Sequence, residues 1–215
     1  MRLAGPNASA RRCRRRAMIG LKRNTVEVVD YDPEWATLAL EACQAARIAC
    51  GELLVDVQHV GSTAVPDLPA KPILDIAAAV VRFDSMPELV RRLGEIGYRY
   101  RRDHGSEGGH LFVVDSPPDI RTIHLHVVEH SSSQWRDYLR FRDLLRHRPA
   151  IRKRYAELKR HLASVCRDDR ELYTALKANF IREILHDNGI ARGHSSEVVA
   201  RIRAVSQCPF CQTMV

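Results

Sequence analysis

The sequence predicts an α+β fold: a mixed β-sheet of about five strands, flanked by helices and followed by a helical C-terminal half. Two apolar segments, VDVQHV (55–60) and PILDIAAAV (72–80), are bounded by Gly, Ser and Pro, a pattern typical of buried strands. From Ser133 onward the apolar residues recur with helical spacing. No apolar run approaches the roughly 18 residues that span a bilayer, so no membrane contact is expected.

The positive charge is concentrated at the N-terminus. Eight of the 34 Lys and Arg residues lie within residues 1–23, which contain no acid, and the remaining 26 balance the 26 acidic residues. We expect residues 1–24 to form a disordered basic leader, with a transit peptide or a true start at Met18 as alternatives. The neutral body has no interleaved aromatic and basic stripe, so nucleic-acid binding by the folded part is not expected.

The first elements after this leader are an extended segment and a helix. Residues 26–31 (VEVVDY) fit a short strand or an extended arm. Asp32 suits the N-cap of a helix that has Pro33 at its first position. This helix is expected to reach about Cys50 and to lead into the two apolar strands.

The rest of the chain alternates helix and strand and then becomes helical, which is typical of an α+β domain. The expected order is a helix over 86–96, strands over 98–102, 110–115 and 120–129, then helices over 133–147, from Pro149, over 169–186 and over 195–205. We expect one domain over 25–190, with a sheet core at 25–130, a helical half at 131–190, and a C-terminal extension at 191–215.

The six cysteines are scattered along the chain, which favours reduced thiols in a cytoplasmic protein. Cys208-Pro-Phe-Cys211 supplies two zinc-type ligands in the C-terminal extension. A structural zinc needs four ligands, and the sequence has no second pair of this kind. A frayed tail is the alternative.

One face of the sheet is expected to carry the chemistry. Because side chains alternate across a strand, Asp75 falls on one face of its strand, and His124 and His126 share the polar face of theirs. A buried carboxylate needs a cation, a metal or hydrogen bonds. If the two strands are neighbours, Asp75 and the histidines suit a divalent metal or acid–base catalysis. The alternatives are an Asp75 salt bridge to Lys71 or an arginine, and structural histidines.

A second candidate site is a phosphate-binding turn next to Asp75. Gly61, Ser62 and Thr63 follow the first apolar strand, and such turns offer backbone N–H groups and a hydroxyl to phosphate. Ser62 as a simple helix N-cap is the alternative. The candidate phosphate clamps, each with a solvated surface position as its alternative, are Lys71, Arg142, Lys159 and Lys177. Arg142 also fits a buried ion pair with Asp143.

Taken together, these segments resemble the GrpB-like family. VQHVGSTAVPDLPAKPILDI (57–76) resembles the family's signature segment, and VVDYDPEW (28–35) matches its usual start. The helical half agrees through HLHV (124–127), FRDLLRHRP (141–149), YAELK (155–159), and Tyr173 with Lys177. The resemblance covers about residues 26–187 and excludes the leader and the CPFC tail.

The resemblance implies a polymerase-beta-like nucleotidyltransferase fold, in which a Gly-Ser turn and three carboxylates hold Mg²⁺ and a nucleoside triphosphate. Here Asp75 matches one carboxylate, but Ile73 and Ala77 are not acidic. His124 and His126 stand where the third carboxylate is expected. Mg²⁺ prefers oxygen ligands, whereas imidazole suits zinc or manganese, so a divalent metal (Mg²⁺, Mn²⁺ or Zn²⁺) and a nucleotide are the cofactors to test.

Three functions are consistent with this sequence. The first is a nucleotidyltransferase-like enzyme acting on a nucleotide or phosphorylated small molecule. The second is a non-catalytic folding-assistance or interaction module with a protein partner, related to the domain that some bacteria fuse to dephospho-CoA kinase. The third is a metal-dependent phosphohydrolase. An open, polar pocket at Asp75 favours an enzyme, whereas a filled, apolar pocket favours the module.

Overall fold

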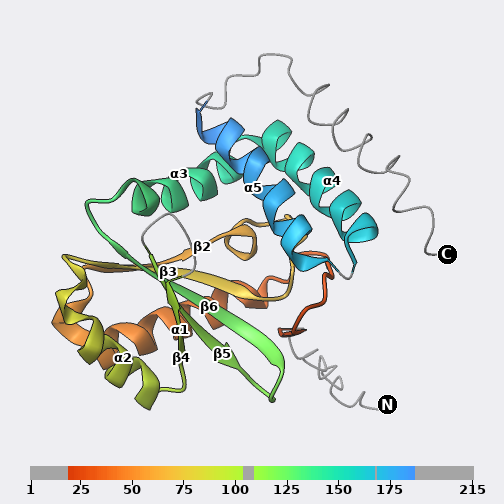
Figure 1. Ribbon diagram of the computed structural model, residues 1–215. Helices are drawn as coiled ribbons and strands as arrows, with labels where there is room; N and C mark the ends of the chain where they lie inside the picture. Colours follow the sequence, from red (N-terminus) through yellow and green to blue (C-terminus); the bar gives the residue numbers. More distant parts are fainter. Residues whose placement is uncertain (1–18, 104–108, 168, 187–215) are drawn as a thin grey trace, which may run out of the picture.

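The computed structural model describes residues 19–103, 109–167 and 169–186 (Figure 1). The elements follow in the order β1 (Leu21–Lys22), α1 (Glu34–Cys50), β2 (Asp56–Val60), β3 (Leu74–Val80), α2 (Met86–Glu95), β4 (Arg99–Asp103), β5 (His110–Asp115), β6 (Ile120–Glu129), α3 (Ser133–His147), α4 (Pro149–Val165) and α5 (Arg170–His186). The predicted α+β class, with its helical C-terminal half, is confirmed.

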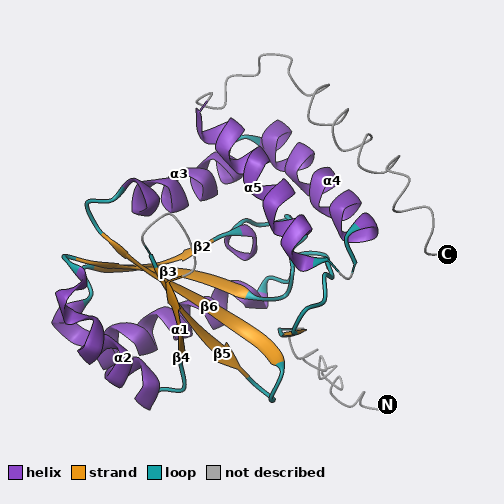
Figure 2. Cartoon of the chain, viewed as in Figure 1, coloured by secondary structure: helices purple, strands orange, loops and turns teal. Residues whose placement is uncertain are grey.

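The sheet has the strand order β2-β3-β6-β5-β4, and β1 adds a short sixth strand against β6 (Figure 2). β3 and β6 run parallel, while the other neighbouring pairs are antiparallel. In the parallel pair, Asp75 lies directly opposite His124, and Ala77 lies opposite His126. The expected adjacency of the two polar strands is therefore present.

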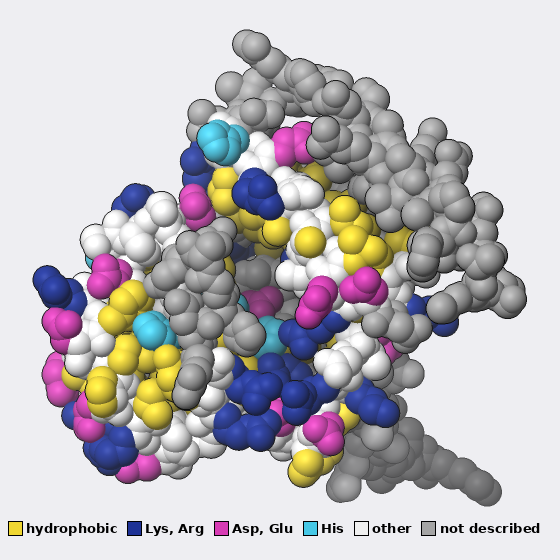
Figure 3. Space-filling view, viewed as in Figure 1, with side chains coloured by type: hydrophobic (Ala, Val, Ile, Leu, Met, Phe, Trp, Pro, Cys, Tyr) yellow, Lys and Arg dark blue, Asp and Glu magenta, His cyan; other side chains and the backbone are white. Residues whose placement is uncertain are grey.

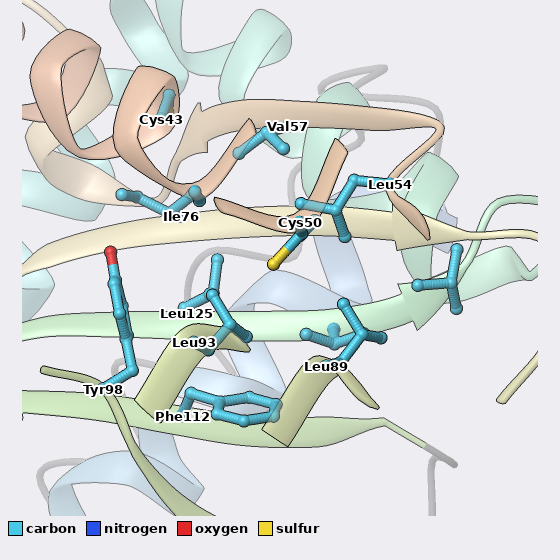
Figure 4. Close-up of a cluster of buried hydrophobic side chains, with 14 of the residues drawn as sticks. Cys43, Cys50, Leu54, Val57, Ile76, Leu89, Leu93, Tyr98, Phe112 and Leu125 are labelled. Atoms are coloured by element: carbon cyan, nitrogen blue, oxygen red, sulfur yellow. The ribbon is translucent and has the colours of Figure 1, made fainter. Parts of the chain in front are cut away.

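One face of the sheet is covered by α1 and α2. Apolar side chains from both helices pack on alternate residues of the strands, such as Ile76 and Leu125 (Figure 4). Cys43 and Cys50 lie in this core as free thiols. Burial raises the pKa of the Cys43 thiol to about 11, so the reactive thiolate is scarce at neutral pH.

The opposite face is covered by the helical half. The small side chains of Ala77 and Ala79 let α3 lie close to β3, where they form a cluster with Trp135 of α3. Helices α3, α4 and α5 share a second core of their own, which includes Tyr155 and Phe180. The sheet and the helical half thus meet along a single seam, on the face that carries the histidines.

Several expectations for the N-terminal part are corrected. Leu21–Lys22 pairs with β6 and Gly20 N–H donates to Pro72 O at 2.7 Å, so the expected disordered leader cannot extend to residue 24. Residues 26–31 form no strand beyond one bridge between Val29 and Ala70, so of the two expected alternatives the extended arm remains. Helix α1 begins at Glu34, one residue later than expected, with the Asp32 carboxylate accepting the Glu34 N–H at 3.0 Å.

Other expectations fall outside the described residues. These are the structure of residues 1–18, the helix over 195–205, the extension at 191–215 and its pair Cys208 and Cys211. Among the described residues, no helix combines the length and apolar character that crossing a membrane requires.

Candidate functional site

Asp75, His124 and His126 converge at the seam between the sheet and the helical half. Asp75 Oδ1 lies 3.1 Å from His124 Nδ1 and 3.9 Å from His126 Nε2. One ligand-type atom from each residue lies within 4.8 Å of the other two. The side chains are 33% (Asp75), 14% (His124) and 28% (His126) exposed, so solvent reaches the cluster.

The ionisation of this cluster follows from its hydrogen bonds. Burial by itself would raise the pKa of Asp75, but the hydrogen bond from His124 and the nearby imidazole of His126 outweigh it and hold that pKa below its ordinary value. Burial lowers the pKa of His124, against the attraction of Asp75. Asp75 is therefore a carboxylate and His124 a neutral imidazole at neutral pH, with His124 Nδ1–H donating to Asp75.

Gly61 is pressed against this carboxylate. Its φ of +69° is one that L side chains rarely adopt. A Cβ at Gly61 would lie 2.6 Å from Asp75 Oδ2 and 2.8 Å from Asp75 Cβ. Only glycine therefore fits here, and the turn predicted to bind phosphate does lie beside Asp75.

The rest of the turn is held by the protein. Ser62–Ala64 forms one turn of 3₁₀ helix with Gly61 at its N-cap and no side-chain cap, so the alternative of Ser62 as a helix N-cap is wrong. Ser62 hydrogen-bonds with the buried Tyr155 phenol. Thr63 is buried, and its hydroxyl lies 2.9 Å from His59 Nε2. The Thr63 hydroxyl is therefore engaged within the turn itself, by His59.

Two lysines of the predicted phosphate set flank one aromatic ring. Lys71 Nζ lies 4.0 Å from the centroid of the Tyr173 ring, and Lys177 Nζ lies 5.8 Å from it. The pKa of Lys71 is lowered to about 7, first by burial and then by the charges of Lys177 and Arg170, against the pull of Asp75. Burial also lowers the pKa of Lys177, whose ammonium Asp75 attracts.

Arg170, at the start of α5, belongs to the same group and was missed by the sequence analysis. Burial lowers its pKa, as do the charges of Arg121 and Arg23, while Asp75 opposes them. Within the part of the chain that the structure describes, no carboxylate forms an ion pair with Lys71, Lys177 or Arg170. The charge of Asp75, which is already hydrogen-bonded to His124, therefore acts on all three cations without forming an ion pair with any of them.

The other two predicted clamps are engaged elsewhere. Lys159 is only 2% exposed; its ammonium donates to Pro69 O and lies over the Tyr155 ring. Arg142 donates to Gln58 Oε1 and to His59 O, both at 3.1 Å. It also pairs with Asp143, as its structural alternative predicted. These contacts tie the helices to β2 and to the loop before β3.

A hollow opens between the sheet and the helical half, with acidic and histidine side chains inside it and a group of Lys and Arg side chains beside it (Figure 3). We use the name cleft for the residues grouped around Asp75. They are Gly61, Ser62, Lys71, Asp75, His124, His126, Arg170, Tyr173 and Lys177.

Helices α4 and α5 repeat one pattern. Tyr155 and Lys159 in α4, and Tyr173 and Lys177 in α5, are each four residues apart. Such pairs lie on one helix face, and in both helices the ammonium lies over the ring of its own tyrosine. The pair in α5 belongs to the site around Asp75, whereas Lys159 of α4 is bound to Pro69 O.

The comparison with known proteins settles the family. A family model described as GrpB protein matches residues 25–187. The chain belongs to the GrpB family. The resemblance inferred from the sequence is therefore confirmed over nearly the whole domain.

Two GrpB proteins show how far this similarity extends. The glutamate-rich protein GrpB of Alkalihalophilus pseudofirmus is 32% identical over 173 residues, which cover 79% of this chain and 99% of that relative. The crystal structure of conserved protein GrpB from Enterococcus faecalis is 32% identical with a TM-score of 0.67, and the match covers 75% of this chain and 99% of that one. Neither description states an activity.

A more distant similarity reaches the Cid1 poly(U) polymerase, in a structure described as bound to MgATP. It is 11% identical with a TM-score of 0.46, and the match covers 64% of this chain and 45% of the polymerase. A similarity at this level says nothing about activity here. The function must be argued from the cleft itself.

Proposed function

We propose that the cleft binds the phosphate groups of a nucleotide or a phosphorylated small molecule. We also propose that this ligand reacts beside Asp75, His124 and His126, by nucleotidyl or phosphoryl transfer. The observation that carries the proposal is the group of three cations, Lys71, Lys177 and Arg170, with no carboxylate partner among the described residues.

Electrostatics favours a multiply charged anion in this position. Each of the three cations disfavours the charge of its neighbours, which is part of why the pKa of Lys71 falls to about 7. A phosphate group placed among them would relieve this repulsion and accept charge-assisted hydrogen bonds. The predicted phosphate-binding turn at Gly61 also lies beside Asp75, which the charges of the three cations reach.

The solvent-accessible cluster supports an enzyme over the non-catalytic module. Asp75 and the two histidines are polar and 14–33% exposed, not filled over by apolar side chains. Pairing a carboxylate with imidazoles beside a phosphate subsite is typical of sites that move protons or bind metal. A purely structural seam would gain more from apolar packing at these positions.

The test is a ligand panel in buffer containing EDTA, so that no metal is needed. Pyrophosphate, the four common nucleoside triphosphates and sulfate are added to the full chain, and thermal shift and calorimetry measure binding. Lys177→Met should lower the affinity for the tightest-binding ligand about 10- to 100-fold, because it removes one charged hydrogen bond. The matched control is Lys153→Met, which removes one exposed lysine of α4 and should change affinity less than about twofold.

The reaction is then followed by product analysis of each bound ligand. If the unchanged protein converts a bound ligand to product, and Asp75→Asn still binds that ligand but no longer converts it, catalysis at this cluster is supported. If no phosphate compound stabilises the chain, or if both lysine variants bind alike, the phosphate proposal fails and the interaction module with a protein partner becomes the better account.

A further inference from the structure

The residues at the seam do not fit the magnesium chemistry that the superfamily resemblance implies. Mg²⁺ is held by oxygen ligands in a near-octahedral shell. In this cluster Asp75 is the one carboxylate, and the other two groups are imidazoles. The positions two residues from Asp75 along the chain are Ile73 and Ala77, which supply no ligand.

The structure assigns to Asp75, His124 and His126 a binding site for an imidazole-preferring divalent ion, with Zn²⁺ as its best occupant and Mg²⁺ excluded. Two imidazoles and one carboxylate are a common protein ligand set of zinc sites. The inference concerns the metal alone and does not rest on the phosphate ligand. It replaces the open choice among Mg²⁺, Mn²⁺ and Zn²⁺ with a preference.

The distances suit a tetrahedral ion. Ligands about 2.0–2.1 Å from zinc are about 3.3 Å apart at tetrahedral angles. Asp75 Oδ1 lies 3.1 Å from His124 Nδ1 and 3.9 Å from His126 Nε2, values on either side of that spacing. A rotation of His126 would bring the three ligands onto one ion, because one ligand atom from each residue lies within 4.8 Å of the other two.

Three protein ligands leave a fourth position open, as in catalytic rather than structural zinc sites. The open side is the solvent-accessible one, since the other side of Asp75 is closed by Gly61. A ligand entering the cleft would therefore approach the free coordination position directly.

Two features of the structure limit the affinity. His124 Nε2 is buried with no hydrogen-bond partner among the described residues. When Nδ1 binds metal, the hydrogen must move to this nitrogen, where it has no acceptor, and such a missing outer partner typically weakens a zinc site 10- to 100-fold. Lys71, Lys177 and Arg170 also repel a divalent cation. We therefore expect a weaker site than in dedicated zinc enzymes.

The experiment measures Zn²⁺, Mn²⁺ and Mg²⁺ binding by calorimetry in phosphate-free buffer. Every protein carries Cys208→Ser and Cys211→Ser, so that the tail thiols cannot bind zinc. Asp75→Asn and His126→Gln are compared with His161→Gln, which replaces an exposed histidine of α4 outside the cluster. Thermal unfolding without metal confirms that each variant is folded.

We expect about one Zn²⁺ per chain, weaker Mn²⁺ and no saturable Mg²⁺ binding. Asp75→Asn and His126→Gln should each lower the affinity for Zn²⁺ at least about tenfold, and His161→Gln should leave that affinity unchanged. Mg²⁺ binding as tight as that of Zn²⁺, no Zn²⁺ binding, or equal binding by all three variants would overturn the assignment. Because phosphate binding is measured in EDTA, either proposal can fail without the other.

Discussion

Replacing Gly61 by alanine tests the close approach between the turn and Asp75. The backbone at Gly61 has φ +69° and ψ −166°, a region that is essentially reserved for glycine. Forcing alanine into it costs about 1–3 kcal/mol. The added Cβ would also overlap Asp75 Cβ at 2.8 Å, an atom fixed to β3 that cannot yield. The carboxylate must then turn away from His124.

At about 2–4 °C per kcal/mol for a chain of this size, the backbone cost alone lowers the melting temperature by about 2–12 °C. Gly97→Ala is the matched control, because Gly97 has φ +90° and no described atom within 4 Å of the added Cβ. Differential scanning calorimetry should show a larger loss for Gly61→Ala, and phosphate or zinc binding should be lost in that variant alone. Equal losses in both variants, with binding intact, would refute the argument.

Acid should destabilise the protein through His59, because burial lowers its pKa from 6.5 to about 4 in the folded chain. Between pH 6.5 and about 4 the unfolded chain binds a proton at His59 that the folded chain does not, so the free energy of unfolding falls by about 3 kcal/mol as the pH drops through this range. Urea unfolding at several pH values should show this dependence, and His59→Gln should reduce it. The affinity for sulfate should fall as the pH rises from about 6 to 8, because Lys71, with a pKa of about 7, loses its charge in this range. If the affinity of Lys71→Met falls in the same way, the titrating group is not Lys71. Arg142→Met should lower the free energy of unfolding by about 2 kcal/mol through its lost bonds to Gln58 and His59, yet change phosphate affinity less than twofold. If Arg142→Met lowers phosphate affinity as much as Lys177→Met does, Arg142 instead contacts the phosphate.

The polar face of the sheet could be predicted because strand alternation is a local property. Asp75 and the two histidines alternate with apolar residues along their strands, so only one orientation of each strand turns its apolar side chains toward the core. Strands β5 and β6 and helix α3 have the bounds that the sequence predicted. Hydrophobic periodicity thus located these elements well.

The partners of these elements could not be predicted in the same way. Nothing in an apolar run specifies that β3 pairs parallel with β6, so the contact between Asp75 and His124 depended on an assumption of adjacency. Arg170 was missed because an arginine on a helix is ordinarily solvated, and its place beside Asp75 arises only when α5 folds over the sheet. The short strand at Leu21–Lys22 was hidden by the basic composition around it.

The two sides of the cleft come from layers with separate hydrophobic cores. The carboxylate and imidazoles belong to the sheet, whereas Lys177 and Arg170 belong to α5. Any molecule held by both sides acts as a non-covalent cross-link between layers that otherwise meet along a seam. Amide hydrogen exchange in α5 should therefore slow on ligand binding more than exchange in α2, which lies on the far face of the sheet.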